Sequence, residues 1–425
     1  MEPVANFGVF GTLTHCSGSS DSVTHLHNGS DYFTQSGLST QFVFCQRGNF
    51  PYTEMMTFRL NKHGWTILLI SVIVLLLYYF SNVGSITPLR GNVISVKRLL
   101  IRCVHLTENA GTVIRSSYKS SNLHARIKGL SEGGGGGPKN ELLTDIDLKS
   151  HHIIVSGLAS DFADLKVISE EHPPVLEGAP YLGPEVFHSD VESRLPNADL
   201  FIPVSDLTLW VDPLDATQEL TEGLLEYVTV MVCVALHGHP IIGIIHQPFL
   251  NRTYWSWKSL SPFNSFTLSP TLVQTLANVS KIQSDSPLTV THSRSHLDTS
   301  ATKTIADTFS PQPVQFIPAG GSGFKVLSLI QRKAHLYVHP TRTRRWDVCA
   351  AQAVLESTGG RMTGLDTSSL TYDANSPHEI DAATGLFAAA SVELHDRWKE
   401  KLSKLRCMSG VIFRIAQSQH GYYST

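Results

Sequence analysis

The chain has 425 residues, of which 42% are apolar and 16% are charged, a composition that excludes wholesale disorder and supplies apolar surface for a large core. Its 33 basic and 36 acidic residues leave a net charge of −3. No strong overall field therefore favours nucleic acid as a partner, and an anionic ligand must be bound by local groups.

Residues 1–54 are rich in Ser, Thr, Asn and Gly without a sustained period, which is typical of a disordered tail. Met55 and Met56 stand just before the next segment, so translation from either would leave a short basic tail. The sequence leaves open whether the upstream stretch is translated. In both cases we expect residues 1–63 to form a disordered or cytosolic tail.

Residues 64–80 read GWTILLISVIVLLLYYF and carry no charge, and as a helix they would span about 25 Å. Trp65 at one end and Tyr78 and Tyr79 at the other suit the two membrane interfaces. The alternative, a buried core helix, normally shows a polar face, and this run has none. We expect a membrane anchor at 64–80, followed by a stalk at 81–92.

Basic residues set the expected orientation of this anchor. Arg59, Lys62 and His63 precede the span, whereas the first basic residue after it is Arg90. The positive-inside rule therefore places the N-terminus in the cytosol and the rest of the chain in a lumen. A cleaved signal peptide is the alternative, but the run is long for one and no clear cleavage site follows it.

The next segments are predicted from their period and their turn residues. Apolar residues from 93 to 119 recur at the spacing of one helix face. The five glycines within Glu132–Pro138 indicate a flexible surface loop and not a phosphate cradle, because no helix start follows them. Tyr227–Ala235 and Ile241–His246 predict a strand hairpin, and a second αβ portion should begin near Leu288.

Residues 210–217, WVDPLDAT, predict a strand that runs into two carboxylates and then a helix start. Asp212 and Asp215 on one turn can share a hard divalent cation, and the Leu214 carbonyl adds an oxygen. Mg²⁺ accepts such a set of oxygen ligands. Backbone N–H groups from Ala216 onward would point at a phosphate.

Two further acidic motifs accompany this one, so three carboxylate clusters follow in order. VISEEH at 167–172 ends a predicted strand in paired acids, and WDVCAA at 346–351 supplies Asp347. An isolated Asp-Pro motif is most often an ordinary turn, and the other two clusters argue against that here. AGGSGFK at 319–325 joins a predicted strand to a helix, and its glycines let backbone N–H groups approach a ligand closely.

Six cysteines are scattered without a CxxC pair or metal-ligand spacing: Cys16, Cys45, Cys103, Cys233, Cys349 and Cys407. Neither a zinc site nor a disulfide framework is therefore expected. Cys233 and Cys349 lie inside apolar runs, where we expect buried free thiols.

The order of these motifs resembles the inositol monophosphatase superfamily, whose members carry an acidic pair, then DPxD[GA]T, then WDxxA. The match covers about residues 93–405. Within the superfamily, DPLDATQE, IIGIIHQPF, SRSH and PAGGSGFKVL are most similar to the Golgi-resident phosphoadenosine phosphatase group, which an N-terminal anchor also fits. The resemblance implies an α/β fold, a layered αβαβα sandwich of the inositol monophosphatase and fructose-1,6-bisphosphatase type. It would occupy residues 93–408, with a first half to about 285 and a tail at 409–425.

The resemblance also implies two to three Mg²⁺ ions. They would be held by carboxylates and one carbonyl: Glu170, Asp212 and Leu214 for the first, Asp212, Asp215 and Asp347 for the second, and Glu170 with Asp147 for a weaker third. Thr217 would orient the attacking water through Asp147, without a covalent phosphoenzyme. Asp145 is a second candidate for that aspartate, but Asp147 keeps the D-x-x-S spacing into a helix. Glu171, the second acid of that pair, is a further candidate, with a solvated or hydrogen-bonding role as an equal alternative.

Substrate-binding residues are implied in the same way: Ala216, Thr217, Ser293, Arg294, His296, Gly320, Gly321, Ser322, Gly323 and Lys325. Lys325 would counter phosphate charge, and Arg294 would contact a second, non-reacting phosphate through two nitrogens. For His296 a structural role is an equal alternative. The arginines at 342, 344 and 345 would attract a phosphorylated substrate, or else form a solvated basic turn.

Together these expectations describe a magnesium-dependent, lithium-sensitive phosphomonoesterase, anchored by one helix in the Golgi membrane with its catalytic part in the lumen. Its substrate would be adenosine 3′,5′-bisphosphate, hydrolysed at the 3′-phosphate to AMP. An inositol phosphate phosphatase would share the metal site and differ in the pocket. A catalytically silent membrane scaffold would have lost a metal carboxylate, and none is lost. The expected partners are the nucleotide and the membrane, without nucleic acid; the oligomeric state stays open, with a homodimer as one option.

Overall fold

The computed structural model describes residues 41–44, 56–59, 62–83, 92–120, 126–133, 137–171, 188–260, 265–279, 287–294, 299–381 and 384–405. The chain divides into two compact units, Met1–Arg90 and Gly91–Thr425. Most of the expected tail at 1–63, most of the expected stalk at 81–92 and the C-terminal tail at 409–425 lie outside the described residues.

The described residues of the smaller unit form one strand pair and one helix. Strand β1 (Gln41–Phe44) pairs antiparallel with β2 (Met56–Arg59), with Phe42 opposite Phe58. The expectation of a tail without structure over 1–54 is therefore wrong for residues 41–44, where aromatic and β-branched residues favour a strand. Helix α1 spans Lys62–Val83 and contains the segment at which we expected the membrane anchor.

Apolar side chains of α1 are exposed, among them Ile67, Leu69 and Leu75. Across the part of the chain that the structure describes, however, no helix combines the length and the apolar character needed to cross a membrane. The expected span at 64–80 is therefore not supported by the structure.

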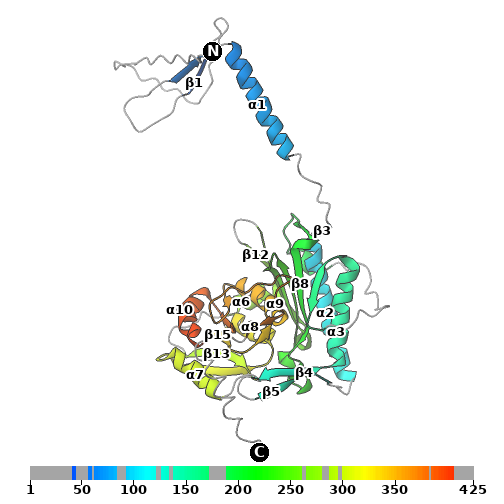
Figure 1. Cartoon of the computed structure of the whole chain (residues 1–425). Coiled ribbons are helices and arrows are strands. Elements are labelled where there is room, and N and C mark those ends of the chain that lie inside the picture. Colours follow the sequence, from blue (N-terminus) through cyan, green and yellow to red (C-terminus); the bar gives the residue numbers. More distant parts are fainter. Residues whose placement is uncertain are drawn as a thin grey trace, which may run out of the picture. The chain divides into compact units, whose positions relative to one another are not determined.

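The first sheet of the larger unit has six strands in the order β12-β11-β10-β9-β8-β6. Only β6 and β8 pair in parallel; the other neighbours are antiparallel. The bounds are β6 Lys166–Ser169, β8 Leu207–Asp215, β9 Thr229–Leu236, β10 His239–Gln247, β11 Arg252–Lys258 and β12 Phe266–Leu268. Helices α2 (Val96–Ser120) and α3 (Asp145–Asp161) cover one face of this sheet (Figure 1).

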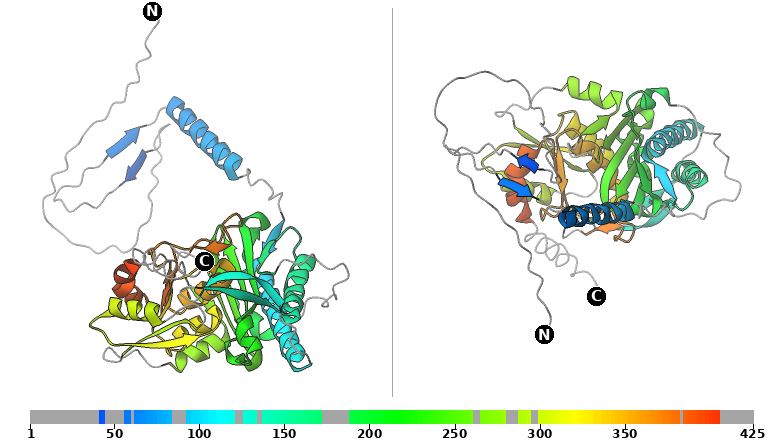
Figure 2. Two further views of the ribbon diagram at one scale, coloured as in Figure 1. Left: turned by 60° about the horizontal axis from the view of Figure 1, so that its bottom comes forward. Right: turned by 90° about the horizontal axis from the view of Figure 1, so that it is seen from above.

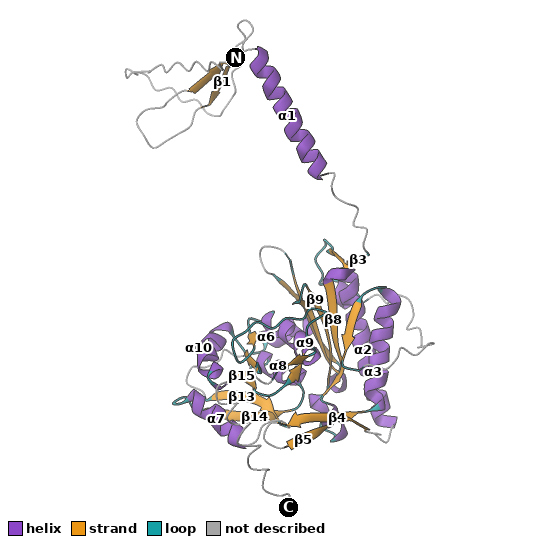
Figure 3. Cartoon of the chain, viewed as in Figure 1, coloured by secondary structure: helices purple, strands orange, loops and turns teal. Residues whose placement is uncertain are grey.

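The second sheet has five strands in the order β14-β13-β15-β19-β17. Their bounds are β13 Leu288–Ser293, β14 Val314–Ala319, β15 Leu336–His339, β17 Arg361–Thr363 and β19 Leu386–Ala389. Helices α8 (Ser322–Ile330) and α9 (Arg345–Glu356) pack between the two sheets, and α7 (Thr299–Phe309) and α10 (Val392–Ser403) cover the outer face. The alternation of helices and strands is visible in Figures 2 and 3.

Three short strand pairs, three short α-helices and three 3₁₀ helices (η1 Val204–Asp206, η2 Leu225–Tyr227 and η3 Pro248–Leu250) complete the described part of this unit. The pairs are β3 (Val93–Ser95) with β7 (Phe201–Pro203), β4 (Arg126–Gly133) with β5 (Gly137–Leu143), and β16 (Thr343–Arg344) with β18 (Glu379–Ile380). The helices are α4 (Ser189–Glu192), α5 (Thr217–Thr221) and α6 (Pro270–Ala277).

Three buried apolar clusters hold these layers together. The first joins α2 and α3 to one face of the first sheet, the second joins its other face to α8, α9 and the second sheet, and the third lies under α7 and α10. The layer order is therefore αβαβα, as the resemblance implied. Each cluster buries apolar surface that supplies the main free energy of folding.

Several local expectations are confirmed. The helix expected from 93 to 119 is α2, which begins at Val96 after the strand β3 and whose buried side chains include Leu99, Leu100 and Ile114. The expected hairpin is formed by β9 and β10, joined by His237 and Gly238, both with positive φ. Such a two-residue turn matches the twist of the flanking strands.

The glycine run is not a loop throughout. Gly133 at the end of β4 pairs with Gly137 at the start of β5, and Glu132 pairs with Pro138. The expected loop over Glu132–Pro138 is therefore wrong at both ends, because the flanking residues continue an antiparallel ladder. Residues 134–136 lie outside the described residues.

Cys233 and Cys349 are not free thiols. They form a disulfide between β9 and α9, with Cα atoms 5.7 Å apart and a sequence separation of 116. The second apolar cluster brings this strand and helix together, so the pairing depends on tertiary packing and leaves no local mark on the sequence.

Candidate metal centre and active site

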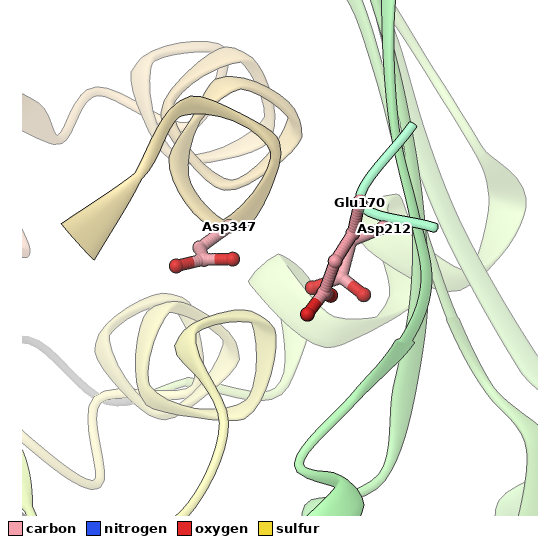
Figure 4. Close-up of side chains that lie close together, drawn as sticks. All are labelled: Glu170, Asp212 and Asp347. Atoms are coloured by element: carbon pink, nitrogen blue, oxygen red, sulfur yellow. The ribbon is translucent and has the colours of Figure 1, made fainter. Parts of the chain in front are cut away.

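Three carboxylates from distant parts of the chain converge between the first sheet and α9. Glu170 directly follows β6, and Asp212 lies on the neighbouring strand β8. Asp347 lies in the first turn of α9. One oxygen from each of the three lies within 4.8 Å of the others. Figure 4 shows Asp347 facing Glu170 and Asp212 from the helix side.

The parallel pairing of β6 and β8 places two of these acids side by side. Ser169 is opposite Val211 in the ladder, and the Glu170 N–H donates to the Val211 carbonyl at 3.0 Å. Glu170 and Asp212, the residues that follow this last pair, therefore lie beside each other. Asp212 is only 1% exposed.

The strand β8 ends in an irregular turn. Its register with β9 shifts between Asp212 and Asp215, and the Leu214 N–H donates to Asp212 Oδ1 at 3.1 Å. Ala216 then adopts a left-handed conformation with φ 72°, from which α5 begins at Thr217. The expected strand, carboxylate pair and helix start are all present.

Burial and the repulsion between the acids favour their protonated forms. Burial raises the pKa of Asp212 well above its usual value, and Glu170, Asp215 and Asp347 raise it further. Burial and Asp215 raise the pKa of Asp347 to about 6. Three convergent carboxylates with clustered negative charge are the oxygen donors that Mg²⁺ prefers, so these residues fit a divalent cation.

Asp147 lies in a separate hydrogen-bonded pair with Thr217. The Thr217 hydroxyl donates to Asp147 Oδ1 at 2.9 Å. Oδ2 of Asp147 accepts the Thr144 backbone N–H at 2.8 Å and also the Thr144 hydroxyl, which caps α3. Asp147 is buried, whereas Asp145 is exposed. Burial raises the pKa of Asp147 to about 6.

Asp215 is bound by the glycine turn between β14 and α8. Its Oδ2 accepts the Gly323 N–H at 2.8 Å and the Thr229 hydroxyl at 3.0 Å. A Cβ on Gly321 would lie 2.9 Å from this same carboxylate, and one on Gly320 would lie 2.3 Å from the Glu219 side chain. The turn is therefore packed against the segment that carries Asp215, and the expected contact of its glycines with substrate stays a prediction.

Lys325 is a buried cation beside the acids. It is 3% exposed, its ammonium lies 5.3 Å from the centre of the Tyr337 ring, and it donates to the Ala319 carbonyl at 3.4 Å. Burial lowers the pKa of Lys325, while Asp215, Glu219 and Asp347 oppose that shift. Its positive charge therefore offsets part of the carboxylate charge from within the protein.

Arg294 is engaged by two acids of the α5 region. One of its nitrogens, Nη1, donates to Glu222 at 2.6 Å and to Glu219 at 3.1 Å. A phosphate at this guanidinium would compete with both carboxylates. Ser293 and Ser322 are buried, and His296 lies outside the described residues.

The basic cluster before α9 is paired with acidic and carbonyl groups. Arg342 Nη1 lies 3.2 Å from Glu379, Arg344 also pairs with Glu379, and Arg345 donates to the Thr371 carbonyl at 2.7 Å. These contacts tie the β16–α9 segment to the chain around residue 379. They differ from the solvated basic turn that was the alternative, and the expected attraction of substrate stays a prediction.

Several supporting residues were missed in the sequence. Thr144 caps α3 and holds Asp147, Thr229 holds Asp215, and Thr343 donates to Asp347 Oδ2 at 3.0 Å. Glu219 is a buried acid that packs on Gly320 and pairs with Arg294. Only Thr144 had a local signal, the T-x-x-D pattern of a capping box; the others follow from tertiary contacts.

Comparisons with known proteins show which family the chain resembles. The Inositol monophosphatase family model matches residues 97–405. "Putative inositol monophosphatase 3" of Drosophila melanogaster is 35% identical over 365 residues, covering 82% of this chain and 95% of that protein. "Golgi-resident adenosine 3′,5′-bisphosphate 3′-phosphatase" of Homo sapiens is 33% identical over 303 residues, covering 68% and 77%.

Solved structures are also similar. CysQ from Bacteroides thetaiotaomicron, described as a bacterial member of the inositol monophosphatase family, is 20% identical with a TM-score of 0.48, covering 69% of this chain and 97% of that chain. The family model alone spans well over half of the sequence. The chain belongs to the inositol monophosphatase family and is a phosphatase of the phosphoric monoester hydrolase type.

Proposed function

We propose that this phosphatase hydrolyses the 3′-phosphate of adenosine 3′,5′-bisphosphate, giving AMP and phosphate, with Mg²⁺ as its cofactor. The observation that carries the proposal is the convergence of Glu170, Asp212 and Asp347 within 4.8 Å. The substrate is supported by the relatives that are named as 3′-phosphatases of this nucleotide.

The residues that would hold the cations are assigned as in the family. They are Glu170, Asp212 and the Leu214 carbonyl for one ion, Asp212, Asp215 and Asp347 for a second, and Glu170 with Asp147 for a third. When bound, such ions supply positive charge that stabilises the attacking and leaving oxygens of an in-line displacement.

Protein groups would position the water and take its proton. Because the Thr217 hydroxyl donates to Asp147, the Thr217 oxygen is left to accept a hydrogen bond from a water molecule. Asp147, with a pKa of about 6, is mostly ionised at neutral pH and can accept the proton that the Thr217 hydroxyl relays. We place the substrate against Ala216, Ser293, Arg294, His296 and the 320–325 turn.

A substrate panel tests this proposal. Phosphate release by the full chain should be fastest with adenosine 3′,5′-bisphosphate, slower with 3′-AMP and inositol 1-phosphate, and absent in EDTA. Asp212→Asn, assigned to two ions, should retain less than about a tenth of wild-type turnover, since lost charge stabilisation costs several kcal/mol. Substantial turnover by this variant would show that Asp212 is not a ligand of the catalytic cations.

A second candidate function is favoured by other relatives, which are named as inositol monophosphatase 3. A preference for inositol 1-phosphate in the same panel would establish that function and exclude the first. An absence of turnover on every substrate with Mg²⁺ present would favour the membrane scaffold.

We also propose that α1 anchors the chain and that the phosphatase part lies in the Golgi lumen. Support comes from relatives named as Golgi-resident and from the uncharged run at 64–80. Asn251 and Asn278 begin glycosylation sequons in the phosphatase part, whereas Asn28 begins one before α1. Endoglycosidase treatment should change the electrophoretic mobility of wild type but not that of a chain that lacks the two downstream sequons. A change in mobility that requires Asn28 would show that the orientation is the reverse of the one proposed. Release of the chain from membranes by alkaline carbonate would exclude the anchor.

A further inference from the structure

The disulfide between Cys233 and Cys349 joins the two elements that carry the metal carboxylates. Cys233 lies on β9 opposite Trp210 of β8, two residues before Asp212. Cys349 lies on α9, two residues after Asp347. The covalent bond therefore connects the strand layer that presents Asp212 to the helix that presents Asp347.

Both sulfurs lie on the face of the sheet that holds the site. Cys233 and Cys349 are fully buried in the same apolar cluster as Trp210 and Met231, and Met231 is the residue opposite Asp212 in the ladder. The bond is therefore buried and does not lie at the protein surface. It fixes the spacing between α9 and the sheet within about one helical turn of Asp347.

This spacing is opposed by charge. Asp347 faces Glu170 and Asp212 across the gap between α9 and the strands (Figure 4), and like charges at this distance repel when no cation lies between them. A crosslink beside the acids resists the separation of α9 from the sheet that this repulsion favours.

From these positions we infer that the Cys233–Cys349 disulfide is a positioning device that holds Asp347 within reach of Asp212 and Glu170, so that its redox state sets the affinity for a divalent cation. The inference rests on the proposed metal centre. Reduction by a dithiol transfers two electrons and two protons: the protein S–S bond breaks to two thiols, and the reductant's two sulfurs form a disulfide.

A third cysteine provides a matched control. Cys103 is also fully buried, but it lies on α2, in the cluster on the opposite face of the first sheet, and is a free thiol. Burial raises the pKa of the Cys103 thiol to about 12, so it stays protonated and is a poor nucleophile toward the disulfide. Replacing Cys103 removes a buried sulfur without changing the link between β9 and α9.

Mn²⁺ binding by the full chain, followed by the electron paramagnetic resonance of free Mn²⁺, tests the inference without relying on turnover. Oxidised wild type is compared with wild type reduced under native conditions, with Cys233→Ala/Cys349→Ala and with Cys103→Ala. Thiol alkylation and mass spectrometry establish the redox state, and circular dichroism establishes that each form is folded.

Reduced wild type and the double variant should bind Mn²⁺ about tenfold or more weakly, a loss in the range found for groups that support metal ligands. Cys103→Ala should bind as the oxidised wild type does. In turnover, loss of the bond should raise the Mg²⁺ concentration needed for half-activation and leave the rate at saturating Mg²⁺ nearly unchanged.

Equal Mn²⁺ affinity in oxidised and reduced wild type would overturn the inference while leaving the proposed function intact. If the double variant fails to fold, the reduced wild type gives the same comparison. If the oxidised chain binds no Mn²⁺, the metal centre itself is wrong, and both the proposed function and the inference fall together.

Discussion

Asp145 and Asp147 stand two residues apart, but only Asp147 is buried and bonded to Thr217. Asp147→Asn should lower kcat by about a hundredfold or more, as expected when a general base is lost. Asp145→Asn should stay near wild type. Because Asp147 also holds the Thr144 cap of α3, thermal midpoints must accompany the rates. Equal losses in kcat from the two variants would contradict the assignment.

Arg294 tests how much of the substrate pocket depends on one guanidinium. A charge-assisted contact to the non-reacting 5′-phosphate should contribute about 1.5–3 kcal/mol, and about 1.4 kcal/mol corresponds to a tenfold change. Arg294→Ala should therefore reduce the kcat/KM preference for adenosine 3′,5′-bisphosphate over 3′-AMP by about tenfold or more, with metal dependence unchanged.

Glu222→Gln is the matched control, because it weakens one partner of Arg294 and keeps the buried Glu219 contact. It should preserve or increase the preference for the bisphosphate. If Arg294→Ala instead lowers kcat/KM equally on both substrates, Arg294 acts only by holding Glu219 and the α5 region in place.

At the scale of elements, the turn between β14 and α8 should be sensitive to a single methyl group. Gly321 has φ 64°, and an added Cβ would lie 2.9 Å from both Asp215 Oδ2 and the Tyr227 carbonyl. Gly321→Ala should therefore displace Asp215 and weaken Mg²⁺ activation, in addition to a backbone cost of about 1–3 kcal/mol.

Gly359 offers a control with the same backbone cost and no contact. Its φ is 85° and nothing lies within 4 Å of an added Cβ. Gly359→Ala should lose stability in thermal unfolding as Gly321→Ala does, but keep wild-type Mg²⁺ activation. Normal activation in Gly321→Ala would show that the turn does not position Asp215.

Elements that depend on neighbours in sequence were predicted well. The β9–β10 hairpin and the β8–α5 junction follow from strand-forming runs and turn residues, and both are present. The glycine run was misjudged because flanking residues continue the β4–β5 ladder through its ends. Pairing partners, and not composition, decide whether such a run is a loop.

At the scale of the whole molecule, the layer order followed from family resemblance, and the contacts between layers could not be predicted. The disulfide joins residues 116 apart, and Arg294 pairs with acids 75 and 72 residues away. Neither pairing has a local pattern. The expected luminal location was the one available hint, because disulfides persist in oxidising compartments.

The buried acids should also determine how stability changes with pH when metal is removed. In the folded chain the pKa values of Asp147 and Asp347 are raised from 3.8 to about 6, and that of Asp212 is raised as well. Between about pH 4 and 6 the folded state therefore binds more protons at these acids than the unfolded state does. Their contribution to the free energy of unfolding falls as pH rises through this window.

Histidines act in the opposite direction, since burial lowers the pKa of His246 and of His395 from 6.5 to about 4. A comparison of wild type with Asp212→Asn in EDTA cancels this contribution. The stability of wild type relative to the variant should fall as pH rises through this same window, because the substituted asparagine carries no charge and relieves the repulsion among the neighbouring acids. At neutral pH, saturating Mg²⁺ should make the thermal midpoint of wild type the higher of the two, the reverse of the order in EDTA. If the order of the two midpoints is the same with and without Mg²⁺, these acids do not form a cation site.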